Sequence, residues 1–299
     1  MINGIINVYK EQGFTSHDVV AKLRGILGQK KIGHTGTLDP NAVGVLPVCL
    51  GRGTKLCDML TATKKQYKTT FLLGRETDTE DIWGEETAAF PVPDSEDTVK
   101  EAILSFVGEY AQIPPMYSAR KVQGRKLYEL AREGKTIERK PQMVKIYEIS
   151  DIEIRLPEVS MTVTCSKGTY IRSLCRDIGR KLQSGACMTE LVRTRSSGFR
   201  IENSHTLEEI QEAADNGRIN EYIMPVERVF SGLQKGTVRR NCYKLLFNGN
   251  PLKLSAFHES GLDTGKKLRV YDEEGHFIGV YGWKKQMFFP DKIFYDQND

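Results

Sequence analysis

The sequence lacks most of the patterns that identify common enzyme sites. No GxxxxGK[ST], GxSxG or HExxH occurs in the 299 residues, and the six cysteines form no CxxC pair. These absences weigh against nucleotide hydrolysis, a serine triad and a zinc centre, because each depends on its own close spacing. We therefore expect no metal, and reduced, buried cysteines. The GRGTK at residues 51–55 is too short for a phosphate loop and predicts a tight turn.

Long apolar segments are also missing. The longest, near Val43–Leu50, is far too short to span a bilayer. The N-terminal MINGIINVYK has no basic region followed by an apolar core, so we predict no secretory signal. We expect a cytoplasmic protein that does not contact membranes, with one large domain or two.

Charge is unevenly distributed, although the net charge is only +4. Residues 75–101 contain 10 acidic and 2 basic side chains. Residues 112–146 contain 9 basic and 3 acidic side chains, and residues 165–200 contain 8 basic and 2 acidic. One such block would fit an ordinary solvated loop. Two basic blocks with interleaved aromatics are typical of a nucleic-acid-binding surface, from which the acidic block should lie away.

Helix and strand patterns are mixed along the first 231 residues. Amphipathic runs that end before a glycine predict helices over residues 16–27, 99–107 and 207–216. Apolar alternation predicts strands over residues 67–73, 144–154 and 159–165. Because these elements do not alternate regularly, they favour an α+β architecture over a doubly wound sheet.

Beyond about residue 232 the pattern changes. Short β-like runs, LRVY, FIGVYG, QMFF and KIFY, are separated by Gly, Asp and Lys turns. They predict a small β-barrel or sandwich of roughly 65 residues, near the lower limit for an independent core. We therefore divide the chain into a large domain, residues 1–231, and a small domain, residues 232–299.

The stretch GHTGTLDP, residues 33–40, contains a single carboxylate, Asp39. Gly33 and Gly36 permit sharp turns, and Pro40 favours an extended conformation for Asp39. An aspartate in such a setting usually forms a turn or a cap. The alternative is a reactive carboxylate that the loop presents to a substrate, and spacing alone favours the turn.

The segment CSKGTYIRSLCRDIGRKL, residues 165–182, predicts a strand that ends near Gly168 and a helix that follows it. Tyr170 and Arg172 then lie at the junction, where side chains often line a site. The planar fork of Arg172 could bind a carboxylate or a phosphate, or simply lie on the surface.

A third candidate is Tyr67. It lies in the segment KKQYKTT, residues 64–70, where three lysines flank it. A tyrosine framed by lysines is suited to stacking on a nucleobase beside its phosphates. The same pattern also fits an edge strand with solubilising lysines.

Together and in this order, these segments resemble the bacterial tRNA pseudouridine-55 synthase (TruB) family. The resemblance runs almost end to end, and the combination of GHTGTLDP with KGTYIR is highly specific. It includes YKEQGFTSHDVV (9–20), KKIGHTGTLDPNAVGVLPVCLGRGTK (30–55), KKQYKTTFLLGRETDTEDIWGE (64–85), PPMYSARKVQGRKLYELAREG (114–134) and CSKGTYIRSLCRDIG (165–179). The tail GLQKG…NGNPLKL…LRVYDEEG resembles a PUA RNA-binding domain, with lower specificity.

The resemblance implies a pseudouridine synthase fold with a mixed, largely antiparallel central sheet, flanking helices and a PUA-like domain. It implies isomerisation of uridine 55 in the T loop of tRNA to pseudouridine, on a flipped-out base and without a cofactor. The expected partner is the T stem-loop of tRNA, over which the basic insertion at residues 112–146 would close. The chain is expected to act as a monomer.

The resemblance also assigns roles to residues. It makes Asp39 the nucleophile, Tyr67 the aromatic that stacks on the base and takes part in proton transfer, and Arg172 the partner of Asp39. The substrate-binding residues that it implies are Lys10, His34, Tyr117, Arg120, Lys121, Tyr170, Leu191 and Arg193. One departure is Glu11, which stands where the family's KPxGxTS motif has proline. The first step stays open between attack on C1′, attack on C6 and removal of a sugar proton.

Two functions of other classes also fit the sequence. The chain could be an RNA-binding helper for tRNA folding, since the basic blocks and the tail would serve that role equally well. It could also be a structural subunit of a larger RNA-modifying complex. The intact set of Asp39, Tyr67 and Arg172 counts against a loss of catalysis.

Overall fold

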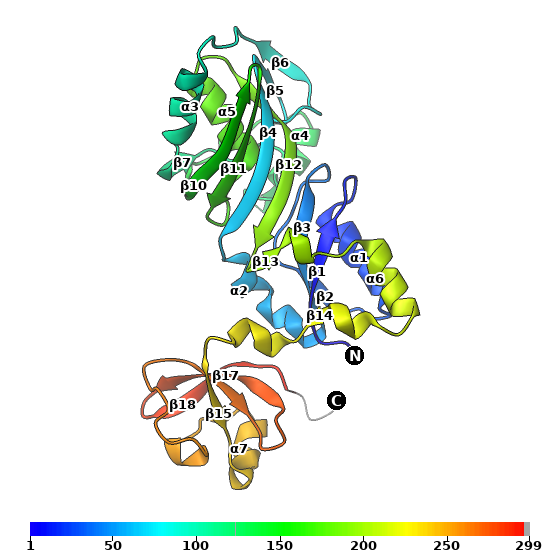
Figure 1. The fold of residues 1–299 in the computed structure, drawn as a ribbon, viewed down its shortest axis with the longest axis vertical. Coiled ribbons are helices and arrows are strands. Elements are labelled where there is room, and N and C mark those ends of the chain that lie inside the picture. The colour runs from blue at the N-terminus through cyan, green and yellow to red at the C-terminus, as the bar shows by residue number, and fades with distance from the viewer. Residues whose placement is uncertain (123, 296–299) are drawn as a thin grey trace.

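The computed structural model describes residues 1–122 and 124–295, and it has the α+β architecture predicted from the sequence (Figure 1). In these residues a 10-stranded mixed sheet has the order β14-β1-β3-β12-β4-β11-β10-β7, with β2 paired to β3 and β13 paired to β12. Its strands are β1 (Gly4–Lys10), β2 (Ile32–His34), β3 (Val43–Leu50), β4 (Lys65–Leu73), β7 (Gly108–Gln112), β10 (Gln142–Arg155), β11 (Glu158–Cys165), β12 (Ala186–Ser196), β13 (Phe199–Arg200) and β14 (Ile223–Met224). All pairings in this sheet are antiparallel except that between β12 and β3.

Helices cover the sheet in two groups (Figure 1). The α-helices are α1 (Ser16–Ile26), α2 (Cys57–Thr61), α3 (Glu96–Leu104), α4 (Leu127–Arg132), α5 (Ile171–Lys181), α6 (Leu207–Asp215) and α7 (Tyr243–Phe247). α3 and α5 contact each other and pack on β10 and β12, whereas α1 and α6 pack together beside β1 and β2. Two short hairpins, β5 (Arg75–Thr77) with β6 (Glu86–Ala89) and β8 (Lys121–Val122) with β9 (Arg125–Lys126), extend from this framework.

Local sequence signals explain the clearest elements. The side chains of Thr15 and Asp18 form the predicted capping box at the start of α1. Val159, Met161 and Val163 are fully buried along β11, which confirms the predicted alternation. The buried face of α5 packs into the same hydrophobic core. This core contains residues at the end of β11 and at the start of α5, on either side of the predicted strand-to-helix junction.

The helix predicted over residues 99–107 lies three residues earlier in the structure, at Glu96–Leu104. α3 ends at Leu104, and Phe106 and Val107 lie beyond it. The Ser105 hydroxyl donates to the Ala102 carbonyl at 2.6 Å, which satisfies an acceptor at the helix end, and the chain then enters β7. Phe106 contacts the ring of Tyr110 in β7, with centroids 5.3 Å apart, whereas Val107 is exposed.

The C-terminal residues form a separate four-stranded sheet with the order β15-β16-β17-β18. Its strands are β15 (Gln234–Thr237), β16 (Leu268–Tyr271), β17 (Phe277–Lys284) and β18 (Met287–Ile293). Isolated bridges join Val238 to Phe257 and Leu252 to Phe288. The predicted β-rich tail is therefore confirmed as a four-stranded sheet, while the division at residue 232 and the PUA-like identity stay predictions.

The GRGTK segment forms a 3₁₀ turn rather than a phosphate loop. Arg52 and Lys55 from this turn donate to the carbonyl oxygens of Phe294 and Ile293, at 2.8 and 2.7 Å. The turn therefore docks the C-terminal sheet onto the large domain. Among the described residues, no helix is long and apolar enough to cross a membrane.

Candidate active site

Asp39 lies in a loop between β2 and β3 that hydrogen bonds hold in place. Its carbonyl oxygen accepts from the Ala42 N–H at 3.1 Å, so Asp39 is the first residue of a tight turn. Just before it, the Leu38 N–H donates to the Ser16 hydroxyl at 2.9 Å. The Asp39 side chain is 41% exposed. The predicted turn is therefore confirmed, and it leaves the carboxylate accessible.

Lys10 holds one side of this loop. Its side chain is fully buried, and its ammonium donates to the carbonyl oxygens of Glu11, Phe14 and Pro40 at 2.9, 2.6 and 2.9 Å. Burial lowers the pKa of Lys10 to about 8, and the nearby Asp39 carboxylate opposes the shift. The resemblance implies that Lys10 binds the substrate. In the structure the side chain has no exposed surface and instead fixes Pro40, the neighbour of Asp39.

Arg193 holds the other side of the loop. Its side chain is fully buried, and its guanidinium donates to the carbonyl oxygens of Val45 and Gly36 at 2.7 and 3.2 Å. β12 brings it there through its parallel pairing with β3, where Gly44 lies against Arg193. A Cβ atom on Gly44 would overlap the Arg193 backbone. The resemblance implies that Arg193, like Lys10, binds substrate; in the structure its side chain has no exposed surface and holds the backbone of the Asp39 loop.

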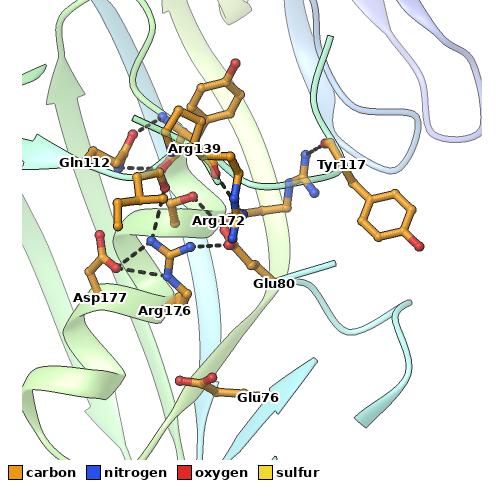
Figure 2. Close-up of polar contacts among 12 residues, drawn as sticks. Glu76, Glu80, Gln112, Tyr117, Arg139, Arg172, Arg176 and Asp177 are labelled. Carbon is orange, nitrogen blue, oxygen red and sulfur yellow. Dashed lines mark hydrogen bonds and ion pairs between the residues drawn. The ribbon is translucent and has the colours of Figure 1, made fainter. Parts of the chain in front are cut away.

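Arg172 pairs with Asp39, as the resemblance implies. Its Nε lies 3.0 Å from Asp39 Oδ2, while the rest of the guanidinium donates to the carbonyl oxygens of Thr79 and Tyr117, both at 2.8 Å. Figure 2 shows the contact with the Tyr117 carbonyl. Asp81 approaches the same guanidinium at 3.6 Å. With a side chain only 5% exposed, Arg172 is held rigidly between two carboxylates.

A cavity of about 360 Å³ opens beside Asp39. Its volume lies within the range of small-ligand sites. The predicted site residues that line it are Asp39, Tyr67, Tyr170, Arg172 and Leu191. Burial raises the pKa of Tyr67, and the neighbouring Arg193 cation opposes the shift. Tyr67 on β4 and Leu191 on β12 supply aromatic and aliphatic surface next to the carboxylate.

Tyr170 occupies the N-terminal cap position of α5. Its backbone N–H and carbonyl both bond the Gln112 side-chain amide, at 2.8 and 3.0 Å (Figure 2). This double contact fixes the strand-to-helix junction on which Arg172 depends. The predicted junction is confirmed.

A buried ionic cluster supports α5 behind Arg172 (Figure 2). Glu80 accepts from the Ser173 hydroxyl at 2.6 Å and pairs with Arg176, which also bonds Asp177 at 2.7 Å. Burial raises the pKa of Glu80, and the Arg176 cation opposes that change. The cluster ties the segment that carries Thr79 and Asp81 to the helix that carries Arg172.

His34 lies at the end of β2, outside the residues that line the cavity. Its ring packs edge to face against His17, with ring centroids 5.6 Å apart. Its Nδ1 accepts from the Gly36 N–H at 3.3 Å, and burial lowers the pKa of His34. Its predicted contact with RNA stays a prediction.

The basic insertion reaches the site through its first residues. Ser118 and Ala119 line the cavity. The Tyr117 hydroxyl donates to Asp78 at 3.2 Å, and Arg120 donates to Gln142 at 2.7 Å. The side chain of Lys121 lies outside the described residues.

Sequence reasoning missed the acidic side of the site. The acidic block is expected to lie away from the RNA surface, yet Asp81 is only 14% exposed and lies beside Arg172. Burial raises the pKa of Asp81, and the Thr79 hydroxyl, which donates to it at 2.6 Å, opposes the shift. The TDTED run at residues 77–81 is the signal that could have found it, because threonines spaced between carboxylates typically form such turns. Within the described ranges, no three His, Cys, Asp or Glu side chains gather as a metal site.

Two family models match adjacent parts of the chain. The TruB family pseudouridylate synthase N-terminal domain matches residues 24–171, and the tRNA pseudouridylate synthase B C-terminal domain matches residues 172–231. The matched residues include Asp39, Tyr67 and Arg172.

Full-length relatives match as well. The tRNA pseudouridine synthase B of Lachnoclostridium phytofermentans is 51% identical over 306 residues, covering 98% of this chain and 100% of the relative. That of Clostridium novyi is 48% identical over 279 residues, covering 93% and 95%. Among solved structures, a chain of an H/ACA ribonucleoprotein bound to a substrate RNA containing 2′-deoxyuridine has a TM-score of 0.71 and 26% identity. The alignment covers 99% of this chain and 86% of that one.

Proposed function

The chain belongs to the TruB family of tRNA pseudouridine synthases, and from this premise we propose that it converts uridine 55 in the T loop of tRNA to pseudouridine. The observation that carries the proposal is the accessible Asp39 carboxylate, paired with the buried Arg172 at the edge of a cavity that contains Tyr67. Asp39 is the nucleophile, because it is the cavity carboxylate that combines exposure with a rigid cationic partner.

The reaction needs no net oxidation or reduction. The N1–C1′ bond of the uridine breaks and a C5–C1′ bond forms, while C5 loses its proton and N1 gains one. Arg172 orients the carboxylate that must attack, because its Nε lies 3.0 Å from Asp39 Oδ2. The rigid contacts of Arg172 also fix the direction of the attack.

The target base must leave the RNA stack to reach Asp39. Extrusion costs a few kcal/mol, which stacking on an aromatic of about 1–3 kcal/mol and phosphate contacts can offset. Tyr67 and Leu191 provide the surfaces for the extruded base, and Tyr170 closes the cavity at the end of α5.

Lys10 and Arg193 act as positioning residues in this proposal. Both are fully buried and hold the loop of Asp39 through backbone carbonyl groups. Their effect on the reaction therefore passes through the placement of Asp39. His34, Arg120 and Lys121 are assigned to RNA contacts around the cavity.

The RNA partner is the T stem-loop, held by the basic insertion and by the PUA-like domain assigned to residues 232–299. The chain's relatives are tRNA pseudouridine synthases B, which supports a tRNA partner. The chain acts alone and without a cofactor, as a cytoplasmic monomer.

The direct test is pseudouridine formation in a T stem-loop RNA incubated with the purified chain alone, measured by mass-shifting chemical labelling. Conversion should occur at position 55 and disappear when that uridine is replaced by cytidine. The control RNA carries cytidine in place of a neighbouring loop uridine and should still react. Binding without conversion would favour an RNA-folding helper, and conversion only after addition of cell extract would favour a subunit of a larger complex.

A further inference from the structure

The hydroxyl of Ser118 is an unused polar group in the catalytic cavity. Ser118 is 5% exposed and lines the cavity together with Asp39 and Tyr67. Its Oγ has no hydrogen-bond partner among the described residues. The backbone of Ser118 is fully engaged, since its N–H donates to Met116 at 2.9 Å and its carbonyl accepts from Tyr128 at 3.1 Å.

Three other polar groups in the same wall have partners within the chain. The Thr61 and Thr169 hydroxyls donate to backbone carbonyls at 2.7 and 3.0 Å. The Lys65 ammonium donates to the carbonyls of Thr61 and Thr63 at 2.9 and 3.2 Å. Buried hydroxyls are nearly always hydrogen-bonded, because an unpaired one loses its bonds to water without replacement. Of the described side chains that line the cavity, Ser118 is the one whose hydroxyl is both buried and without a partner, which leaves it available to a substrate atom.

The position of Ser118 limits what that partner can be. The preceding residue, Tyr117, gives its carbonyl oxygen to Arg172, which holds Asp39. Ser118 is thus fixed beside the pair that acts at the glycosidic bond. The oxygens that flank this bond in a uridine are the ribose 2′-hydroxyl and the uracil O2, and both can accept a hydrogen bond.

We propose that Ser118 Oγ donates a hydrogen bond to an oxygen flanking the glycosidic bond of the target uridine and so positions that bond against Asp39. The inference rests on the proposed function, because it requires a uridine in this cavity. Removing the hydroxyl should weaken RNA binding and slow conversion by about three- to tenfold, the usual effect of losing one neutral hydrogen bond.

The test is a double-mutant cycle between protein and RNA. Ser118→Ala and wild type are each titrated with T stem-loops that carry uridine, 2′-deoxyuridine or 2-thiouridine at the target position. Dissociation constants are compared, so an RNA that does not react still counts. With one analogue, Ser118→Ala should no longer raise the dissociation constant above that of wild type. That analogue is 2′-deoxyuridine if the partner is the ribose hydroxyl. It is 2-thiouridine if the partner is O2, since sulfur is a weak acceptor. An equal penalty on all three RNAs, or no penalty at all, would overturn the proposal.

Two controls separate this inference from its premise. Ser196 also has a buried hydroxyl with no partner among the described residues, but it lies outside the cavity, so Ser196→Ala should behave as wild type on every RNA. Ser118→Ala should be at least as stable as wild type to urea, because no protein hydrogen bond is lost; lower stability would show an internal partner and contradict the proposal. If wild type itself fails to convert uridine, the proposed function fails, independently of the Ser118 comparison.

Discussion

At the scale of single residues, the site depends on one exposed carboxylate held by buried cations. Asp39 combines 41% exposure with contacts to a guanidinium whose side chain is 5% exposed. Lys10 and Arg193 are more deeply buried still and bind backbone carbonyl groups. The proposed nucleophile is thus accessible to a substrate, while the groups that place it are buried.

Replacing Arg172 with lysine tests this arrangement. Lysine keeps the positive charge but cannot bind Asp39 and the carbonyls of Thr79 and Tyr117 together. We expect single-turnover conversion to fall by about 100-fold, the usual effect of misplacing a reacting group by about 1 Å, with RNA affinity changed only a few-fold. Arg180→Lys is the matched control, because Arg180 lies on the same helix and also pairs with a carboxylate, that of Glu76. The Arg180 side chain is 58% exposed. Equal losses in both variants would contradict the assignment.

The buried ammonium of Lys10 predicts a pH-dependent stability. Its folded pKa of about 8 lies below the unfolded value of about 10.4. The unfolded chain therefore binds more protons between these values, and the contribution of Lys10 to the unfolding free energy rises as the pH increases through this window. It is fully present above about pH 10.5 and is lost as the pH falls towards 8.

Lys10→Met measures this contribution. We expect the wild-type unfolding free energy, relative to that of Lys10→Met, to increase by about 1–2 kcal/mol between pH 7.5 and 9.5 in urea titrations. Burial also lowers the pKa of Lys65 to about 8, but Lys65 is present in both proteins and cancels in the difference. A difference that stays constant or shrinks over this range would contradict the placement of the Lys10 ammonium.

At the scale of elements, the contact between α5 and β12 sets the position of Arg172. Gly179 of α5 lies directly against the backbone at Gly185 and Ala186, where a Cβ atom would overlap. The helix can therefore approach the sheet only because this position lacks a side chain.

Gly179→Ala should lower the unfolding free energy by at least about 2 kcal/mol and slow conversion, because the overlap involves rigid backbone. Gly25→Ala is the matched control on α1. A Cβ atom there meets nothing within 4 Å, and alanine in a helix should stabilise the fold by about 0.5–1 kcal/mol. Chemical denaturation measures the unfolding free energy of both variants. Similar changes in the two would contradict the close packing of Gly179 against β12.

Elements with strong local signals could be predicted from the sequence, and contacts between distant segments could not. The capping box of Thr15 and the alternation along β11 are local, and both were correct. The burial of Lys10 and the approach of Asp81 to Arg172 depend on how separate elements pack. Asp39 itself was identifiable only through the motif resemblance, because an aspartate beside Gly and Pro is locally a turn residue, as the structure confirms.

At the scale of the whole molecule, one hydrophobic cluster joins the C-terminal sheet to the large sheet. Val280 of β17 and Phe294, just after β18, pack with Ile5 and Leu56. Together with the contacts of Arg52 and Lys55, this cluster fixes the C-terminal sheet relative to the rest of the chain. A rigid arrangement of this kind suits a partner that contacts both parts at once.

The basic segments predict a steep salt dependence of RNA binding. Each phosphate contact releases counterions, so log K should fall linearly with log salt concentration. Lys140→Gln in the basic insertion should reduce the slope by about one unit, whereas the exposed Lys100→Gln in the acidic block should leave it unchanged. Fluorescence anisotropy with a T stem-loop between low and moderate potassium chloride measures both. A flat response in the wild type would contradict the assigned RNA surface.

Asp39→Asn is the decisive test of the assignment of Asp39 as the nucleophile. Asparagine keeps the shape of the side chain and the turn but cannot attack as a carboxylate. Pseudouridine formation and affinity for a T stem-loop should be measured on the same preparation. We expect no detectable pseudouridine, with a dissociation constant within about threefold of the wild-type value because the phosphate contacts are untouched. Turnover by the Asp39→Asn protein would contradict the assignment of Asp39 as the nucleophile.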